Sequence, residues 1–480
     1  MAGFSSLEIG KRALLAQKFG LDITSNNIAN VNTPGFSRRS TVLSETDPLK
    51  KNSNFIGSGV IVSKIQSFRQ EYYDKEIRNS LSRINLFEND ISFLNRIETI
   101  LIEPGENSIS NTLSQFFNSF RELTVRPDNI SLRQNLLTIS NTLSDRFNQV
   151  ANNFAELRND TKKNSENIIK NINSLLINIS ELNNEISKTS NNITTESQTL
   201  VDQRATKLEE LSKYLDVKIG YNPDGTINIF NNGINILTNN VPSKIILKEN
   251  VDSFNSERTL KVFNVNDENN SEIEINPSSG ELASNIKLYN ITLDDNDTSN
   301  QYSISKKFND FVSNFANRIN TYFSLGYGLN DTSDTPPNRP LFVSDSSEIN
   351  AKNIKINSQL IERPEDIPLS SKVKESGNNQ IALLVSEFAY DDNFLDNLNP
   401  IDFYANFIGK IGITLKENQN NHNSSKLIEQ QLNSQRESLI GVNLDEEAVN
   451  LIKYQKAFEA STRIITVTNE LLANLIRLGL

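Results

Sequence analysis

Side chains that commonly carry catalysis or bind metal ions are scarce in this sequence. Its 480 residues include no cysteine and one histidine, His422. This excludes thiol catalysis, disulfides and thiolate metal sites, and it leaves little room for a Ser/His/Asp triad. His422 lies in the polar run 418–425, and we interpret it as a solvated loop residue. The sequence therefore predicts no catalytic, cofactor-binding or metal-binding residue, and no enzyme.

Three groups of charged residues could still do chemistry. The acidic cluster at 294–297 lacks the glycine and trailing glutamate of a calcium-binding loop, and we interpret it as a solvated turn. The run 445–447 could pass for paired catalytic carboxylates, but acidic side chains at a helix start cap free N–H groups and suit the helix dipole. Arg38 and Arg39 are either exposed solubilising charges or contacts with acidic surface on a neighbouring subunit, since guanidinium groups pair well with carboxylates.

The balance of charged residues excludes some classes of binding partner. With 48 Lys and Arg against 59 Asp and Glu, the net charge is −11, which argues against binding nucleic acid or an anionic membrane. No apolar stretch approaches the ~18 residues of a membrane span. The N-terminus lacks the basic region and apolar core of a secretory signal. We expect a protein that is cytoplasmic or exported without a cleaved signal peptide, with no small-molecule substrate.

We expect long helices to form the framework that positions the charged groups described above. No glycine occurs between Gly105 and Gly220, and no proline between Pro127 and Pro223, so we predict an uninterrupted helix over 128–214. Its apolar residues recur every three or four positions: Leu136, Ile139, Leu143, Phe147, Val150, Phe154 and Leu157. Such a narrow apolar stripe must pack against other helices.

After residue 214 the apolar period changes from helical to two, which indicates strands. The predicted strands are 217–221, 226–230, 244–247, 259–265, 272–275 and 286–293. Helical spacing returns over 308–323, a loop-rich stretch follows over 326–377, and the chain is helical again from 402. Helices therefore flank an inserted β-rich region.

Each end of the chain carries an apolar stripe with heptad spacing. The N-terminal stripe is Leu7, Leu14, Leu21 and Ile28; the C-terminal one is Leu444, Leu451, Phe458, Ile465 and Leu472, with Tyr454 and Leu475 at the second core position. Ser461 and Thr468 are polar at the remaining core positions, which weakens an isolated helix pair. The stripes are either ordinary core of a bundle or segments that order on contact with other subunits.

The predicted fold is mainly α with an inserted β domain: a long helical bundle or coiled coil built from both termini, plus an outer β-rich domain. The predicted domains are an N-terminal helix and extended segment (1–66), a long-helix bundle (67–216), the β-rich insertion (217–300), a return helix with loops (301–400) and C-terminal helices (401–480).

Two terminal motifs resemble a known family. Asn26-Asn-Ile-Ala-Asn-Val-Asn-Thr-Pro-Gly35 and the segment 441–460, Gly-Val-Asn-Leu-Asp-Glu-Glu-Ala-Val-Asn-Leu-Ile-Lys-Tyr-Gln-Lys-Ala-Phe-Glu-Ala, resemble the N- and C-terminal signatures of the axial proteins of the bacterial flagellum. Within that family, Gly35-Phe-Ser-Arg-Arg39, Leu200-Val-Asp-Gln-Arg204 and Asp224-Gly-Thr-Ile-Asn228 resemble the hook-associated protein 1 group. The similarity covers nearly the whole chain and is weakest over about 245–300.

The resemblance implies a structural subunit that joins the flagellar hook to the filament. Its implied partners are further copies of itself in a helical oligomer, the hook protein, the second junction protein (hook-associated protein 3) and an export chaperone. Its place would be the flagellum, external or periplasmic. Together with the stripes, it suggests these subunit-interface residues: Leu7, Leu14, Leu21, Ile28, Asn30, Asn32, Pro34, Gly35, Phe36, Arg38, Leu444, Leu451, Tyr454, Phe458, Ile465, Leu472 and Leu475.

Two alternatives stay open at this point. Another axial protein, such as the hook subunit, would share both signatures but not the Phe36-Ser-Arg38 sequence or the long helix. A secreted adhesin or surface hydrolase on a helical stalk would need a concave polar site within 217–300. That segment contains no histidine and no evident nucleophile–base pair.

Overall fold

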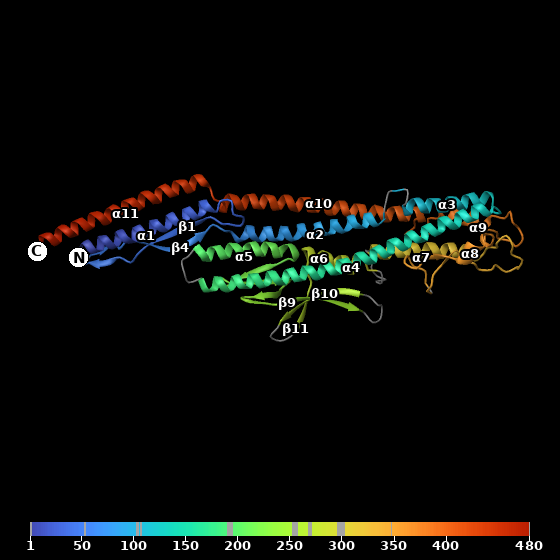
Figure 1. Cartoon of the computed structure of the whole chain (residues 1–480), viewed down its shortest axis with the longest axis horizontal. Helices are drawn as coiled ribbons and strands as arrows, with labels where there is room; N and C mark the ends of the chain where they lie inside the picture. The colour runs from blue at the N-terminus through green and yellow to red at the C-terminus, as the bar shows by residue number, and fades with distance from the viewer. Residues whose placement is uncertain are drawn as a thin grey trace.

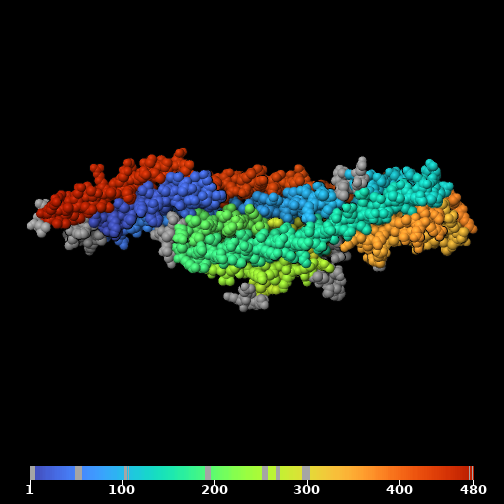
Figure 2. Space-filling model, viewed as in Figure 1, coloured from blue at the N-terminus to red at the C-terminus, as the bar shows by residue number. Residues whose placement is uncertain are grey.

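The computed structural model shows an elongated molecule with both chain ends at one tip (Figure 1). It describes residues 2–51, 54–101, 105, 108–189, 195–251, 258–266, 271–294, 303–346 and 348–479. At the tip, helices α1 (Ala2–Ala29) and α11 (Leu444–Leu478) lie side by side and form what we call the stem. Figure 2 shows the stem as a narrow extension of a thicker body. The predicted mainly α fold with paired terminal helices is confirmed.

Two hairpins accompany the stem. Strand β1 (Arg39–Glu45) pairs antiparallel with β4 (Val60–Ser67), and β2 (Leu49–Lys51) pairs with β3 (Asn54–Ile56). Strand β1 follows the turn after α1, and β4 leads into the first body helix. The β1–β4 hairpin therefore links the stem to the body.

The body is built on long antiparallel helices. Helix α2 (Glu71–Leu101) lies along α10 (Pro400–Ile440), where the Ser80 hydroxyl donates to the Ser425 carbonyl at 2.9 Å. Proline suits the first helical position of α10, and the preceding Asn399 side chain caps the helix. Helix α3 (Ile109–Val125) begins with a similar serine cap.

The predicted uninterrupted helix over 128–214 is wrong. Helix α4 (Ile130–Thr189) is followed by a separate helix, α5 (Thr195–Tyr214), which runs back along α4. Arg204 donates to the Asn183 side chain at 2.8 Å, and Asn171 reaches the Tyr214 hydroxyl at 3.4 Å. The sequence between the helices has no glycine or proline, but it is rich in serine and asparagine. Such side chains compete for backbone groups and disfavour helix interiors.

Two small antiparallel sheets lie beside α4 (Figure 1). Their strand orders are β5-β6-β7-β8 and β11-β10-β9. The strands are β5 (Lys218–Tyr221), β6 (Ile227–Asn231), β7 (Ile234–Thr238), β8 (Val241–Pro242), β9 (Lys244–Val251), β10 (Arg258–Asn266) and β11 (Ser271–Ile275). The predicted strands up to residue 275 are confirmed.

The predicted strand over 286–293 is wrong. The chain instead forms helix α6 (Glu281–Lys287), which continues into a π-helical turn, η1 (Leu288–Thr292). Leu282, Leu288 and Leu293 are buried. A short apolar run is compatible with either a strand or a buried helix, and here packing against α4 decides.

The rest of the body confirms the predicted helix–loop–helix order. Helix α7 (Ile304–Phe323) is followed by a loop-rich stretch with short elements, and then by α10. The short elements are β12 (Phe342–Val343), β13 (Lys355–Ile356), α8 (Ser358–Glu362), the 3-10 turn η2 (Pro364–Asp366) and α9 (Gln380–Phe388).

Two charged or polar sites differ from their predicted surroundings. His422 lies within α10 rather than in a loop, because α10 continues along α2 through this polar run. Asp294 is buried and pairs with Arg158 at 3.3 Å rather than standing in solvent, since the end of η1 is held against α4. The other members of that cluster, residues 295–297, lie outside the described residues.

Two apolar cores hold the body together. The larger one joins parts of α2, α3, α4, α7, α9 and α10 and is dominated by phenylalanine rings. Phe315 lies at its centre, with ring contacts to Phe116, Phe117, Phe342 and Phe388. The smaller core joins the second half of α4 to α5, α6 and the sheets.

Phe315→Ala should lower the free energy of unfolding by about 3–5 kcal/mol, because it leaves a cavity among rings that cannot close around it. Phe315 is 0% exposed, whereas Val125 is 76% exposed. Val125→Ala is the matched control and should change stability by no more than ~0.5 kcal/mol. Chemical denaturation of the two variants measures both effects; similar losses would contradict this assignment of the core.

Candidate assembly stem and its joint with the body

The stem helices approach each other closely at two glycines of α1. A Cβ added at Gly10 would lie 2.9 Å from Ile465 Cγ1, and one at Gly20 would lie 2.6 Å from the ring of Tyr454. The earlier glycine of α1 faces the later residue of α11, and the later glycine faces the earlier one, so the two helices run antiparallel. Glycine is needed here because any side chain would push the helices apart.

The heptad residues lie mostly along this seam. Leu7, Leu14, Leu21, Ile28, Leu451, Tyr454, Phe458, Ile465 and Leu472 are half-buried, whereas Leu444 is 51% exposed at the base of α11. The Leu475 side chain lies outside the described part of the chain. Ser461 and Thr468 are buried, and their hydroxyls donate to carbonyl groups of their own helix. Their small size lets the helices pack closely, which offsets the weakness expected from their polarity.

A second apolar stripe of α11 faces away from α1. Val449, Val467 and Leu471 are 65%, 47% and 58% exposed. Their spacing places them on one side of the helix, at a wide angle from Tyr454 and Ile465. The stem therefore has an apolar surface that the described residues of this chain leave open.

The turn after α1 contains the other predicted site residues. Asn30 donates to the Asn26 carbonyl and accepts from the Thr33 hydroxyl, which ends the helix. Asn32 and Pro34 are exposed. Gly35 has a φ of +77°, and a Cβ there would lie 2.7 Å from the Thr206 hydroxyl of α5. This turn requires glycine on both grounds.

Arg38 ties this turn to the start of α11. It pairs with Glu446 and with Glu447, both at 2.7 Å. Glu447 is only 2% exposed and also accepts from the Asn27 amide at 3.1 Å. The same Asn27 side chain bonds both backbone groups of Arg39. The run 445–447 thus begins a helix as predicted, and it also holds the two ends of the chain together.

Arg39 enters a buried charge network that we call the joint. It pairs with Asp202 of α5 at 2.8 Å, and its guanidinium lies 4.8 Å from the Phe36 ring centroid. Asp202 also accepts from Ser37 at 2.8 Å and from Arg69 at 3.0 Å.

The joint extends from Arg69 to the end of α10. Arg69 pairs with Asp74 at 2.6 Å, and Arg436 bridges Asp74 and Glu209 at 3.4 Å and 2.5 Å. The joint thus contains three arginines, Arg39, Arg69 and Arg436, whose positive charges are matched by the three carboxylates of Asp202, Asp74 and Glu209.

The charges of the joint support one another. Burial alone would lower the pKa of the Arg69 guanidinium, but Asp74, Asp202 and Glu209 outweigh that effect and raise its pKa above the ordinary value. Each carboxylate of the joint pairs with at least one of the three guanidinium groups. Such a network positions chain segments and gives no group free to act as acid, base or nucleophile.

The contacts of several of these residues were not predicted from the sequence. Asn27, Asp202, Asp74 and Glu447 are all nearly inaccessible to solvent. Asn27 and Glu447 lie inside the terminal motifs, so the motifs were the available signal. Arg38 was predicted as a possible subunit contact, and the structure pairs it within the chain; an additional contact with a neighbour stays a prediction. The alternative that Arg38 and Arg39 are free solubilising charges is wrong.

Within the described part of the chain, no cluster of acidic and histidine side chains is arranged to bind a metal ion. Among the same residues, no helix has the length and apolar character needed to cross a membrane.

Asp202→Asn should lower the free energy of unfolding by about 3–5 kcal/mol, because it leaves Arg39 and Arg69 buried without their shared charge partner. The matched control is Asp160→Asn, which breaks the exposed pair with Arg96 and should cost about 0–1 kcal/mol. Denaturant unfolding of both variants provides the comparison. Equal small losses would mean that the joint contributes no more than a surface ion pair.

Three family models match separate parts of this architecture. "Flagella basal body rod protein" matches residues 7–36, in α1 and the following turn. "Flagellar hook-associated protein FlgK helical domain" matches residues 94–342 of the body. "Flagellar basal body rod FlgEFG protein C-terminal" matches residues 438–478, which include α11.

Individual proteins agree with these matches. Flagellar hook-associated protein 1 of Bacillus subtilis is 25% identical over 516 aligned residues, which cover 98% of each chain. The Salmonella typhimurium protein of the same name is 26% identical over 134 residues, 28% of this chain and 24% of that one. The flagellar hook junction protein FlgK from Burkholderia pseudomallei has a similar fold, with a TM-score of 0.60 at 10% identity over 76% of this chain and all of the other. Because the helical-domain model alone spans more than half of the residues, the chain belongs to the flagellar hook-associated protein 1 (FlgK) family, the non-enzymatic structural subunits of the hook–filament junction.

Proposed function

We propose that copies of this chain assemble into the junction through their stems, and that the outer stripe of α11 is the principal contact between copies. The stripe carries this proposal because a two-helix stem cannot bury an apolar face on the side away from its partner helix. Val449, Val467 and Leu471 form this face and are 65%, 47% and 58% exposed. Packing stems side by side in a helical oligomer would remove it from water, at a gain of roughly 25 cal/mol per Å² of apolar surface.

The predicted interface residues divide into two roles in this proposal. The seam residues, such as Tyr454 and Ile465, would hold the stem of each copy together. Leu444, Asn32 and Pro34 are exposed near the base of the stem and would contact neighbouring copies. Of the proposed domains, 1–66 and the α11 part of 401–480 are the assembling parts, and 217–300 faces outward.

The proposed partners follow from a junction that is open at both ends. Identical subunits that pack head to tail present one surface below and a different one above. We assign the lower surface to the hook protein and the upper one to the second junction protein, hook-associated protein 3. The exposed apolar stripe would need cover before assembly, which favours an export chaperone. Export without a cleaved signal peptide, to an external or periplasmic flagellum, completes the proposal.

Val467→Asp should abolish filament attachment while the purified chain folds normally, because the charge would be buried only between copies, at a cost of several kcal/mol. Ile465→Asp should instead disturb the stem itself, since Ile465 faces Gly10. Thr466→Asp puts the same charge on an exposed polar side of α11 and serves as the control. Electron microscopy scores attachment, and circular dichroism scores folding. Normal filaments with Val467→Asp would overturn the proposed role of the stripe.

Cells that lack this chain should keep intact hooks but carry neither filament nor the second junction protein, because nothing would offer the matching upper surface. Electron microscopy of hooks and immunoblotting of shed flagellin and hook-associated protein 3 in the medium test this. Absence of hooks would place the chain below the hook. Retention of the second junction protein on bare hooks would contradict the proposed order.

A further inference from the structure

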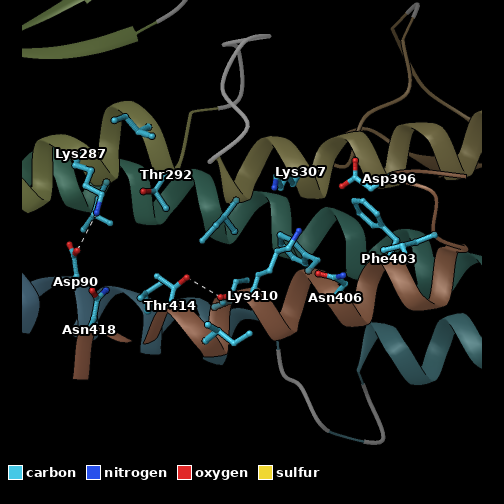
Figure 3. Close-up of a pocket in the computed structure, with 18 residues that line it drawn as sticks. Asp90, Lys287, Thr292, Lys307, Asp396, Phe403, Asn406, Lys410, Thr414 and Asn418 are labelled. Atoms are coloured by element: carbon cyan, nitrogen blue, oxygen red, sulfur yellow. Dashed lines mark hydrogen bonds and ion pairs between the residues drawn. The ribbon is translucent and has the colours of Figure 1, made fainter. Parts of the chain in front are cut away.

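A groove of about 870 Å³ opens on the body, between α10 and the α6–η1–α7 segment (Figure 3). Its floor is apolar and includes the buried residues Leu94, Leu288, Phe407 and Ile411. One wall ends in Ile413, which is 60% exposed. Exposed apolar side chains beside an apolar floor are typical of a surface that binds a partner.

The edge of the groove is positively charged in an otherwise acidic protein. Three lysines and two aspartates line it, whereas the whole chain has a net charge of −11. Lys287 pairs with Asp90 at 3.5 Å. Lys307 of α7 and Lys410 of α10 reach the opening from opposite walls (Figure 3) and have no ion pair among the described residues. A fitting occupant is therefore apolar and carries a carboxylate.

Helix α9, at the end of the body far from the stem, presents such a surface (Figure 1). Its inner side, with Val385 and Phe388, is buried in the large core. Its outer side carries Leu383 and Leu384, which are 38% and 36% exposed, and Tyr390, which follows two residues after the helix ends, is 66% exposed. These side chains form an apolar surface that the described residues of this chain leave uncovered.

A carboxylate lies in the middle of this surface. Glu387 is exposed on the same side of α9, one turn from Leu383 and Leu384, and has no ion pair among the residues that the structure describes. Arg121 is the neighbouring cation, and it donates to the Tyr390 hydroxyl at 2.6 Å. We call Leu383, Leu384, Glu387 and Tyr390 the α9 knob.

We propose that the groove of one copy of this chain receives the α9 knob of a second copy, with Glu387 between Lys307 and Lys410. Two different, complementary surfaces on one chain define a head-to-tail contact between identical subunits. The apolar knob would cover the groove floor, and the carboxylate would lie within reach of both unpaired lysines and offset part of their charge. This inference rests on the proposed assembly of copies and adds a contact between their bodies to the one between their stems.

Because the chain contains no cysteine of its own, only introduced cysteines can link two copies of it through a disulfide. Leu384→Cys and Ile413→Cys would be placed on two differently tagged full-length chains that are co-expressed in cells with assembled flagella. Oxidation should give a disulfide-linked dimer that carries both tags. The matched control replaces Ile413→Cys by Ile177→Cys, a 50% exposed site on α4, and should give none.

Charge reversal provides an independent measurement. Lys410→Glu and Glu387→Lys should each reduce the tagged dimer, because each leaves like charges facing one another. Combining the two on separate cysteine-bearing copies should restore it. Failure of the combination to restore the dimer, or equal cross-linking by the Ile177→Cys control, would overturn the proposal.

The outcomes also separate this contact from the stem contact. Attached filaments without the dimer would reject the knob and groove and leave the stem proposal standing. Normal attachment in Val467→Asp, with the dimer formed, would reject the stem contact and leave the knob and groove standing. A cross-link from Ile413→Cys to a different flagellar protein would also overturn the assignment to a second copy.

Discussion

Both ends of the chain leave the body at one place, and the buried charge network there limits how the stem and body can be arranged. Arg39, Asp202 and Arg69 are largely removed from water, where an unpaired charge is costly, so they are stable only as a group. Each comes from a different part of the chain: the turn after α1, helix α5 and the segment before α2. The network is complete only when all three segments are in place, which ties the direction of the stem to the packing of the body.

The spacing of apolar residues along the sequence predicted the elements that bury one face against an apolar core. The heptad stripes, the spacing of the α7 phenylalanines and the alternation in β5 and β6 all follow from burial of one side. The reversal between α4 and α5 was missed because no glycine or proline marks it. The joint was missed for a different reason. Arg39 and Asp202 are 163 positions apart, and Arg38 and Glu447 are 409 apart, so before folding the carboxylates are ordinary acidic residues of helical segments.

The stem also shows that polarity alone is a poor guide to a helix seam. Ser461 and Thr468 satisfy their hydroxyls within α11, and opposite this side α1 has Gly10 and Gly20 against Ile465 and Tyr454. The two stem helices thus make contact because their backbones approach closely, and large side chains are not needed on both helices to fill the space between them. Exposed apolar side chains lie on the outer sides of α11 and of α9. In the proposed assembly, these outer sides are the contacts between copies.

The antiparallel stem has a consequence for when a copy becomes usable. Helix α1 precedes the whole body in the sequence and α11 follows it, and neither can bury its seam without the other. A copy that lacks α11 keeps the phenylalanine core of the body but has no second helix for α1. The fold therefore makes the presence of both helices a condition for forming the stem, and copies without either one are excluded by their geometry alone.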